Sequence, residues 1–329
     1  SICVGLLVWY GGVNNANGID ISIGTLFLFI TMSGLLFRPL RQIADRFNTL
    51  QMGMVAVDRI FSIFENDSII NETGDIDETN FKGKIDFRNV RFSYISNIEV
   101  LKGISFSVKP GETLAIVGPT GSGKTTIINL ISRLYNLNSG QINIDDRSIN
   151  EYKLNCLRSN IGVILQDVFL FADTIHNNVT LFDENISKDE VINAAKELGI
   201  HEFIMSLPEN YKFNVQERGN TLSAGQKQLI AFMRVLIKNP DILILDEATS
   251  SIDSYSEDLI KNATKKITKN KTSIIIAHRL ATIEAASTII YMEDGVILEA
   301  GNHYELIELE NGRYRKMHQE QFSNTEILD

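Results

Sequence analysis

Hydrophobic and polar positions divide the chain into three stretches. Residues 1–64 are apolar at first and then carry a helical stripe, residues 65–83 are polar, and from residue 84 short apolar runs alternate with amphipathic segments. Alternating strands and helices over a long stretch are typical of an α/β domain with a mainly parallel sheet. We therefore predict a helical part over 1–64, a linker over 65–83 and an α/β domain over 84–329.

The first part has the pattern of a membrane hairpin. Residues 21–37 are a run of seventeen residues without a charge. This length is near the lower limit for crossing a bilayer. Three arginines follow, beginning with Arg38, whereas Trp9 and Tyr10 lie at the opposite end of the hairpin. Because positive charge marks the cytoplasmic side and aromatic residues mark the interface, Arg38 is expected to face the cytoplasm. A buried hairpin of a soluble protein is the alternative at this length.

A regular apolar stripe follows the uncharged run. Its members recur at alternating spacings of three and four, which places them on one face of a helix. We predict a cytosolic extension of the membrane helix that packs against other helices, with an isolated two-stranded coiled coil as the alternative. The stripe consists of Leu40, Ile43, Phe47, Leu50, Met54, Val57, Phe61 and Phe64.

Composition and charge exclude some functions. Hydrophobic residues make up 44% of the chain, enough for a packed core, and the formal net charge is -10. An acidic balance argues against nucleic acid as a partner, because phosphate backbones are bound by clustered Lys and Arg. The two cysteines, Cys3 and Cys156, form no CxxC pair, and the five histidines lack zinc-like spacing. The sequence therefore predicts neither a disulfide framework nor a zinc site.

Residues 118–125 read Gly-Pro-Thr-Gly-Ser-Gly-Lys-Thr and fit the phosphate-loop pattern GxxxxGK[ST]. The pattern stands between a predicted strand over 113–117 and a predicted helix over 125–135, which is the context that it requires. Glycines let successive N–H groups point inward, and the helix N-terminus adds positive charge, so the loop can hold phosphate. Lys124 is expected to reach the β- and γ-phosphates, and Thr125 to bind Mg²⁺. The predicted binding residues are Gly118, Pro119, Thr120, Gly121, Ser122, Gly123, Lys124, Thr125 and Thr126.

A second apolar strand ends in two acids. Residues 242–245 are followed by Asp246 and Glu247. Asp246 is expected to bind Mg²⁺ and Glu247 to act as general base toward the attacking water. Many parallel strands end in an acid, so this interpretation depends on the phosphate loop. Together the two motifs predict a P-loop NTPase, which leaves kinase, helicase, GTPase and transporter motor open.

Residues 222–226, Leu-Ser-Ala-Gly-Gln, precede an amphipathic segment and resemble the LSGGQ signature of ABC ATPases, with Ala224 in place of a glycine. By itself the motif is a serine N-cap, and a helix N-terminus with Ser and Gly donors is also an anion site. The resemblance implies that Ser223, Gly225 and Gln226 bind the γ-phosphate of ATP held by a partner domain.

Four further positions match motifs of the same family, in family order. The resemblance implies that Tyr94 stacks on adenine, that Gln166 senses Mg²⁺ and the attacking water, that Asp253 lies in a loop crossing to the partner, and that His278 contacts the γ-phosphate. Glu247, His278 and Gln166 would then be catalytic, and Thr125, Gln166 and Asp246 would hold the metal. Each of two residues has an alternative when it is considered alone. Tyr94 would then be an aromatic residue on the face of a sheet, and His278 would have a structural role.

The resemblance extends over the whole chain. Residues 216–219 resemble an exporter-specific loop, and residues 37–40 with the stripe resemble the end of the sixth membrane helix of an exporter half. It implies an ABC cassette with a mainly parallel core sheet, an antiparallel β subdomain and a helical subdomain, preceded by a transmembrane helical segment. It further implies an ATPase that uses ATP and Mg²⁺ to export a lipid, peptide or drug-like substrate.

The implied partners are a second half-transporter, identical or related, the lipid bilayer and the transported substrate. The implied location is the cell inner membrane, as a multi-pass protein with its nucleotide-binding domain in the cytoplasm. A soluble ABC ATPase of DNA maintenance or translation is the alternative, and a regulatory nucleotide-binding module without turnover is a third. Because Glu247, Gln166 and His278 are all present, the sequence favours ATP hydrolysis over a regulatory module without turnover.

Overall fold

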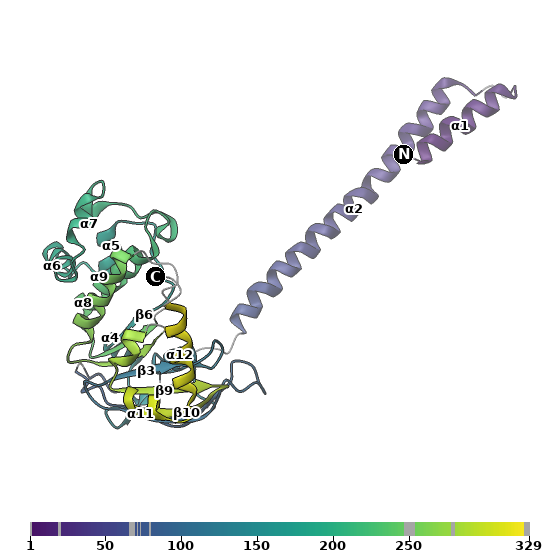
Figure 1. Ribbon diagram of the computed structural model, residues 1–329. Coiled ribbons are helices and arrows are strands. Elements are labelled where there is room, and N and C mark those ends of the chain that lie inside the picture. Colours follow the sequence, from purple (N-terminus) through teal and green to yellow (C-terminus); the bar gives the residue numbers. More distant parts are fainter. Residues whose placement is uncertain are drawn as a thin grey trace. The chain divides into compact units, whose positions relative to one another are not determined.

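The computed structural model describes residues 2–18, 21–65, 70, 72, 74–78, 80–246, 254–277 and 280–325. The chain divides into two compact units, Ser1–Ile69 and Ile70–Asp329. In Figure 1 the first unit is the helical pair in purple and blue, and the second unit carries the sheets.

The first unit consists of α1 (Ile2–Ala16) and α2 (Ile23–Phe64). Ser22 begins α2, because its side chain accepts a hydrogen bond from the Thr25 N–H at 3.2 Å. The helix then continues for 42 residues through Pro39, so the uncharged run and the apolar stripe lie on one helix. Within the described residues, α2 is the helix long and apolar enough to cross a membrane, with a mean hydropathy of 1.6 over its most apolar window.

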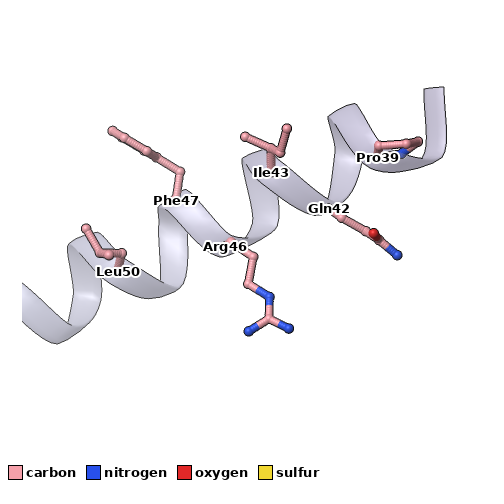
Figure 2. Close-up of a pocket in the computed structure, with 6 residues that line it drawn as sticks. All are labelled: Pro39, Gln42, Ile43, Arg46, Phe47 and Leu50. Carbon is pink, nitrogen blue, oxygen red and sulfur yellow. The ribbon is translucent and has the colours of Figure 1, made fainter. Parts of the chain in front are cut away.

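The apolar stripe lies uncovered on α2. All eight of its side chains are exposed within residues 2–65. Ile43, Phe47 and Leu50 project from one side of the helix, and Arg46 projects from another (Figure 2). Over residues 39–50 the helix therefore has an apolar side and a polar side, as the spacing predicts.

The second unit contains two sheets. The smaller has the order β2-β1-β4-β5 and is antiparallel, and the larger has the order β10-β9-β3-β8-β7-β6. Strands β9, β3, β8, β7 and β6 are parallel, and β10 pairs antiparallel with β9. The strands are β1 (Ile85–Phe92), β2 (Leu101–Val108), β3 (Thr113–Val117), β4 (Ser139–Ile144), β5 (Arg147–Ser148), β6 (Ile161–Ile164), β7 (Ile242–Asp246), β8 (Thr272–Ile276), β9 (Thr288–Glu293) and β10 (Val296–Gly301).

Helices α5 to α9 form one group within the second unit. In Figure 1 the teal and green helices α5 to α9 lie together, away from the antiparallel sheet. The α-helices are α3 (Lys124–Ile131), α4 (Leu154–Ser159), α5 (Ile175–Thr180), α6 (Lys188–Leu198), α7 (His201–Ser206), α8 (Ala224–Lys238), α9 (Ser254–Thr268), α10 (Leu280–Glu284), α11 (His303–Glu308) and α12 (Arg313–Thr325). Short 3-10 turns are η1 (Ile149–Glu151), η2 (Asn210–Lys212) and η3 (Glu217–Gly219).

The six-stranded sheet separates two hydrophobic cores. Side chains alternate along each strand, so Leu114 of β3 lies in one core and Ala115 in the other. The first core joins this sheet to α3, α4 and the antiparallel sheet, and the second joins it to α5–α9, α11 and α12. This arrangement confirms the predicted α/β class with a mainly parallel sheet, an antiparallel β part and a helical part.

Two segments differ from the simplest interpretation of the sequence. Part of the predicted linker packs on the second unit, because Ile76 exchanges backbone hydrogen bonds with Glu151 and Lys153, and Phe81 is buried. The pattern of residues 303–322 predicts one helix that closes the α/β domain, and the structure instead has the pair α11 and α12. The chain turns between them at Asn311, whose φ is 63°, followed by Gly312.

Candidate active site

The phosphate loop lies between β3 and α3, as the sequence predicts. Gly118, Gly121 and Gly123 have φ of 141°, 83° and 100°, values that favour glycine. A Cβ at Gly118 would collide with the carbonyl of Met292, and one at Gly123 would lie 2.8 Å from a methyl group of Leu101. Close packing against β9 and β2 therefore leaves no room for a side chain at these two positions, and curled backbone with inward N–H groups is suited to an anion.

Lys124 opens α3 with its side chain folded over the loop. Its Nζ donates to the carbonyls of Gly118 and Pro119, both at 2.8 Å, and the residue is 7% exposed. Burial lowers the pKa of Lys124, and the negative charge of Asp246 partly offsets this effect. A phosphate in the loop would supply the counter-charge that Lys124 largely lacks among its described neighbours.

The carboxyl ends of the parallel strands bring the phosphate loop and two further predicted residues to one edge. Asp246 is the last residue of β7 and is buried, Gln166 follows β6 by two positions and is exposed, and the phosphate loop follows β3. Strand β8 lies between β3 and β7, and the N–H of Ala277 at its end bonds the Ile116 carbonyl of β3 at 3.3 Å. Parallel α/β sheets bind ligands at this edge.

Tyr94 lies beside α3 with its ring half-exposed. Its hydroxyl bonds the Thr126 hydroxyl at 3.3 Å and accepts from the Asn129 amide at 2.9 Å. Phe92 and Tyr135 meet the ring edge-on, with centroids 4.8 and 4.9 Å away. These contacts fix the ring next to the phosphate-binding helix, and the exposed part of the ring can stack on a base.

The signature segment begins α8. Ser223 and Gln226 form a reciprocal capping box, in which the Gln226 N–H donates to Ser223 Oγ at 3.2 Å and the Ser223 N–H donates to Gln226 Oε1 at 2.9 Å. Gly225 is buried, whereas Ser223 is exposed. The first N–H groups of a helix have no intrahelical acceptor, so this end of α8 can donate to an anion. Helices α3 and α8 pack on opposite faces of the six-stranded sheet, so the two anion-binding ends serve different surfaces.

Three predicted residues, Glu247, Asp253 and His278, lie outside the described residues. Glu247 directly follows Asp246, and His278 directly follows Ala277. Their roles therefore remain predictions that rest on the motifs.

The structure adds a groove that the sequence did not reveal. It opens beside the Gln166 segment and is lined by Val163, Leu165, Val168, Phe169, Phe171 and Arg234. Arg234 reaches across from α8 and donates to the carbonyls of Phe169 at 3.0 Å and Asn178 at 2.7 Å. In the sequence, two phenylalanines in one loop, Phe169 and Phe171, are a signal for this groove. The spacing of residues does not show that α8 packs beside that loop.

The loop predicted to be exporter-specific borders this region. The N–H of Val215 bonds the Asp173 carbonyl at 3.0 Å, and Gly219 packs against Leu170. Gln216 and Arg218 are exposed and have φ of 61° and 54°. Non-glycine residues in this region of φ are uncommon and cluster at functional sites.

A phosphate loop and an acid-ended strand at one edge of a parallel sheet define a P-loop nucleotide-binding domain. A family profile described as ABC transporter matches residues 101–250. Residues 101–250 therefore form a domain of the ABC transporter family, and membership of this family implies that the domain binds ATP.

Proteins similar in sequence to this chain include ABC transporter proteins. The chain is 42% identical over 315 residues to the probable multidrug resistance ABC transporter ATP-binding/permease protein YheH of Bacillus subtilis, covering 95% of this chain and 46% of that protein. It is 38% identical over 327 residues to the ATP-dependent lipid A-core flippase of Syntrophus aciditrophicus, covering 99% and 54%. The solved structure of a bacterial Atm1-family ABC exporter with ATP bound matches with a TM-score of 0.73 and 36% identity, covering 91% of this chain and 53% of that one. The chain thus spans about half the length of these relatives.

Proposed function

We propose that the chain is the ATP-hydrolysing part of an ABC exporter subunit, which couples hydrolysis to export of a lipid, peptide or drug-like substrate. The observation that carries the proposal is the shared edge of the parallel sheet, where the phosphate loop, Asp246 and Gln166 lie at the carboxyl ends of β3, β7 and β6. The names of the relatives, which include multidrug and lipid flippase proteins, support the transport class. The helix α2, with the composition of a membrane span, supports it independently.

In this proposal the phosphate loop binds the triphosphate and Tyr94 stacks on adenine. Thr125, Gln166 and Asp246 offer hydroxyl, amide and carboxylate oxygens, which is the donor set that Mg²⁺ prefers, so these residues fit the ion. The ion would neutralise charge on the phosphates. Glu247 takes the proton of the attacking water, and His278 contacts the γ-phosphate.

We propose further that hydrolysis takes place between two cassettes. Ser223, Gly225 and Gln226 of one subunit would donate to the γ-phosphate bound by the other, with Asp253 crossing between them. The opposite placement of α3 and α8 on the sheet supports this, because the two helix N-termini belong to different layers of the cassette. The partner is a second half-transporter, identical or related.

Residues 1–64 would belong to the membrane domain, with Arg38 toward the cytoplasm, and residues 65–83 would connect it to the cassette over 84–329. The groove beside Phe169 and Phe171, with the strained Gln216 and Arg218 next to it, would receive the cytosolic ends of the membrane helices. The location is then the cell inner membrane, with the cassette in the cytoplasm.

Reconstitution of the full-length gene product in lipid vesicles tests the proposal. Mg²⁺-dependent ATP hydrolysis with transport of at least one member of a panel of lipids, peptides and drugs is the expected result. Recovery of the full-length protein in the soluble fraction, with hydrolysis unaffected by membranes, would favour the soluble ABC ATPase of DNA maintenance or translation instead.

A further inference from the structure

A cluster of two histidines and a glutamate lies where three helices of the second unit meet. Glu284 ends α10, His303 begins α11 and His318 lies in α12. One potential ligand atom from each residue lies within 4.8 Å of the other two. The turn at Asn311 and Gly312 makes this possible, because it separates α11 from α12 and allows the second histidine to approach the first.

A buried phenol orients His303. Its Nδ1 bonds the hydroxyl of Tyr314 at 2.8 Å, and Tyr314 is fully buried. The ring of His303 stands edge-on to Tyr314 and its centroid is 5.3 Å from that of His318. When Nδ1 carries the proton and donates it to the phenol oxygen, the lone pair is on Nε2, and a hydrogen bond on the far nitrogen is how proteins fix a metal-binding imidazole.

The other two residues already meet. His318 Nε2 and Glu284 Oε1 are 2.9 Å apart. A Zn²⁺ ion with tetrahedral bonds of about 2.0–2.1 Å holds its ligand atoms roughly 3.4 Å from each other. The pair therefore needs little movement, and no separation in the cluster has to close by more than about 1.4 Å, the difference between 4.8 and 3.4 Å. The side chains of Glu284 and His318 are 39% and 13% exposed, which leaves a path for the ion.

The donor set selects the metal. Two imidazole nitrogens and one carboxylate are ligands for Zn²⁺ and related divalent transition metals, whereas Mg²⁺ and Ca²⁺ prefer oxygen alone. We propose that Glu284, His303 and His318 bind one Zn²⁺ ion and leave a fourth position to water. The ion would displace the proton shared by His318 and Glu284 and would tie α10 to α11 and α12.

Zinc titration of the chain in detergent tests the site, after removal of metals with EDTA and without nucleotide or Mg²⁺. A chromophoric chelator in competition reports both stoichiometry and affinity. We expect wild type to bind one Zn²⁺, and each of His303→Ala, His318→Ala and Glu284→Gln to weaken that binding by about tenfold or more. Glu284 is exposed, so Glu284→Gln keeps the fold even where a histidine variant does not.

His201 supplies a matched control. Its Nδ1 bonds the hydroxyl of Tyr211 at 2.9 Å, which repeats the contact between His303 and Tyr314 on a different helix. It does not belong to the His–His–Glu cluster found among the described residues. His201→Ala should bind Zn²⁺ as wild type does. Wild type without a zinc site overturns the proposal, as does equal binding by wild type and Glu284→Gln.

Discussion

At the scale of single residues, Lys124 carries its charge where burial opposes it. Its folded pKa lies below the ordinary 10.5, so at neutral pH the charged form destabilises the ligand-free fold, and this cost disappears as pH rises through the folded pKa toward 10.5. Lys124→Met should therefore leave the thermal unfolding midpoint at pH 7 unchanged or higher. Its midpoint should also rise less with pH in the alkaline range than that of wild type.

The same variant should lose the response to nucleotide. In wild type, ATP with Mg²⁺ raises the unfolding midpoint because it binds only the folded state, and Lys124→Met removes the charge that faces the phosphates. Unfolding scans with and without ATP measure both effects in one experiment. A Lys124→Met protein that ATP still stabilises fully would show that the phosphates bind elsewhere.

Tyr94 can be tested separately from the phosphates. Tyr94→Ala should weaken ATP binding by about 1–3 kcal/mol if one base stacks there, whereas Tyr94→Phe keeps the ring and loses only its bonds to Thr126 and Asn129. Equilibrium titration should show tripolyphosphate, which has no base, binding to all three proteins alike. Equal losses for ATP and tripolyphosphate in Tyr94→Ala would mean that the residue only supports α3.

Local motifs predicted where the phosphate loop and Asp246 lie, since each follows a strand that the sequence indicates, whereas Gln166 came from the family resemblance. Parallel pairing brings all three to one edge of the sheet. Contacts between distant segments were not predictable. Arg234 meets the Asn178 carbonyl across 56 positions, and His303, His318 and Glu284 converge from three helices without zinc-like spacing. The Asn-Gly pair at 311–312 was a turn signal that could have divided the C-terminal helix.

At the scale of elements, the capping box gives Ser223 a structural task besides its proposed contact with ATP. Ser223→Ala should lower the free energy of unfolding by about 0.5–2 kcal/mol, because the Gln226 N–H loses its acceptor. Ser223→Asp should restore that stability, since aspartate caps as well as serine. Denaturant unfolding of the two variants and wild type measures the difference.

Ser223→Asp also distinguishes the helix-capping role of Ser223 from its proposed contact with ATP. Its carboxylate would repel a phosphate that approaches the N-terminus of α8, so Ser223→Asp should hydrolyse ATP poorly although it is stable. Normal turnover by a stable Ser223→Asp would leave the segment as a helix cap and nothing more.

At the scale of the whole molecule, the proposed sandwich predicts how nucleotide controls association. Glu247→Gln should keep ATP binding, slow phosphate release by a factor of about 10² to 10⁴ and accumulate as an ATP-bound dimer, because opening needs hydrolysis. Adding Ser223→Arg should abolish that dimer while the monomer still binds ATP. Light scattering on residues 70–329, with and without ATP and Mg²⁺, checks both.

Glu184→Gln, a change at an exposed glutamate on the helical part, serves as the control and should behave as wild type. Steady-state phosphate release near wild-type rates in Glu247→Gln would remove the general-base assignment. Dimerisation of the double variant would contradict the proposed sandwich of two cassettes but not the proposed nucleotide site.

The uncovered stripe on α2 has a consequence for the life of the protein in a cell. Exposed apolar surface of this extent is what chaperones and quality-control proteases recognise, and within residues 2–65 the large side chains from Leu40 to Phe64 lie open. A newly made subunit would present this surface until other helices cover it. The amount of each subunit that survives would then be set by the supply of its assembly partners, so degradation of unassembled copies would balance the two halves without any control of synthesis.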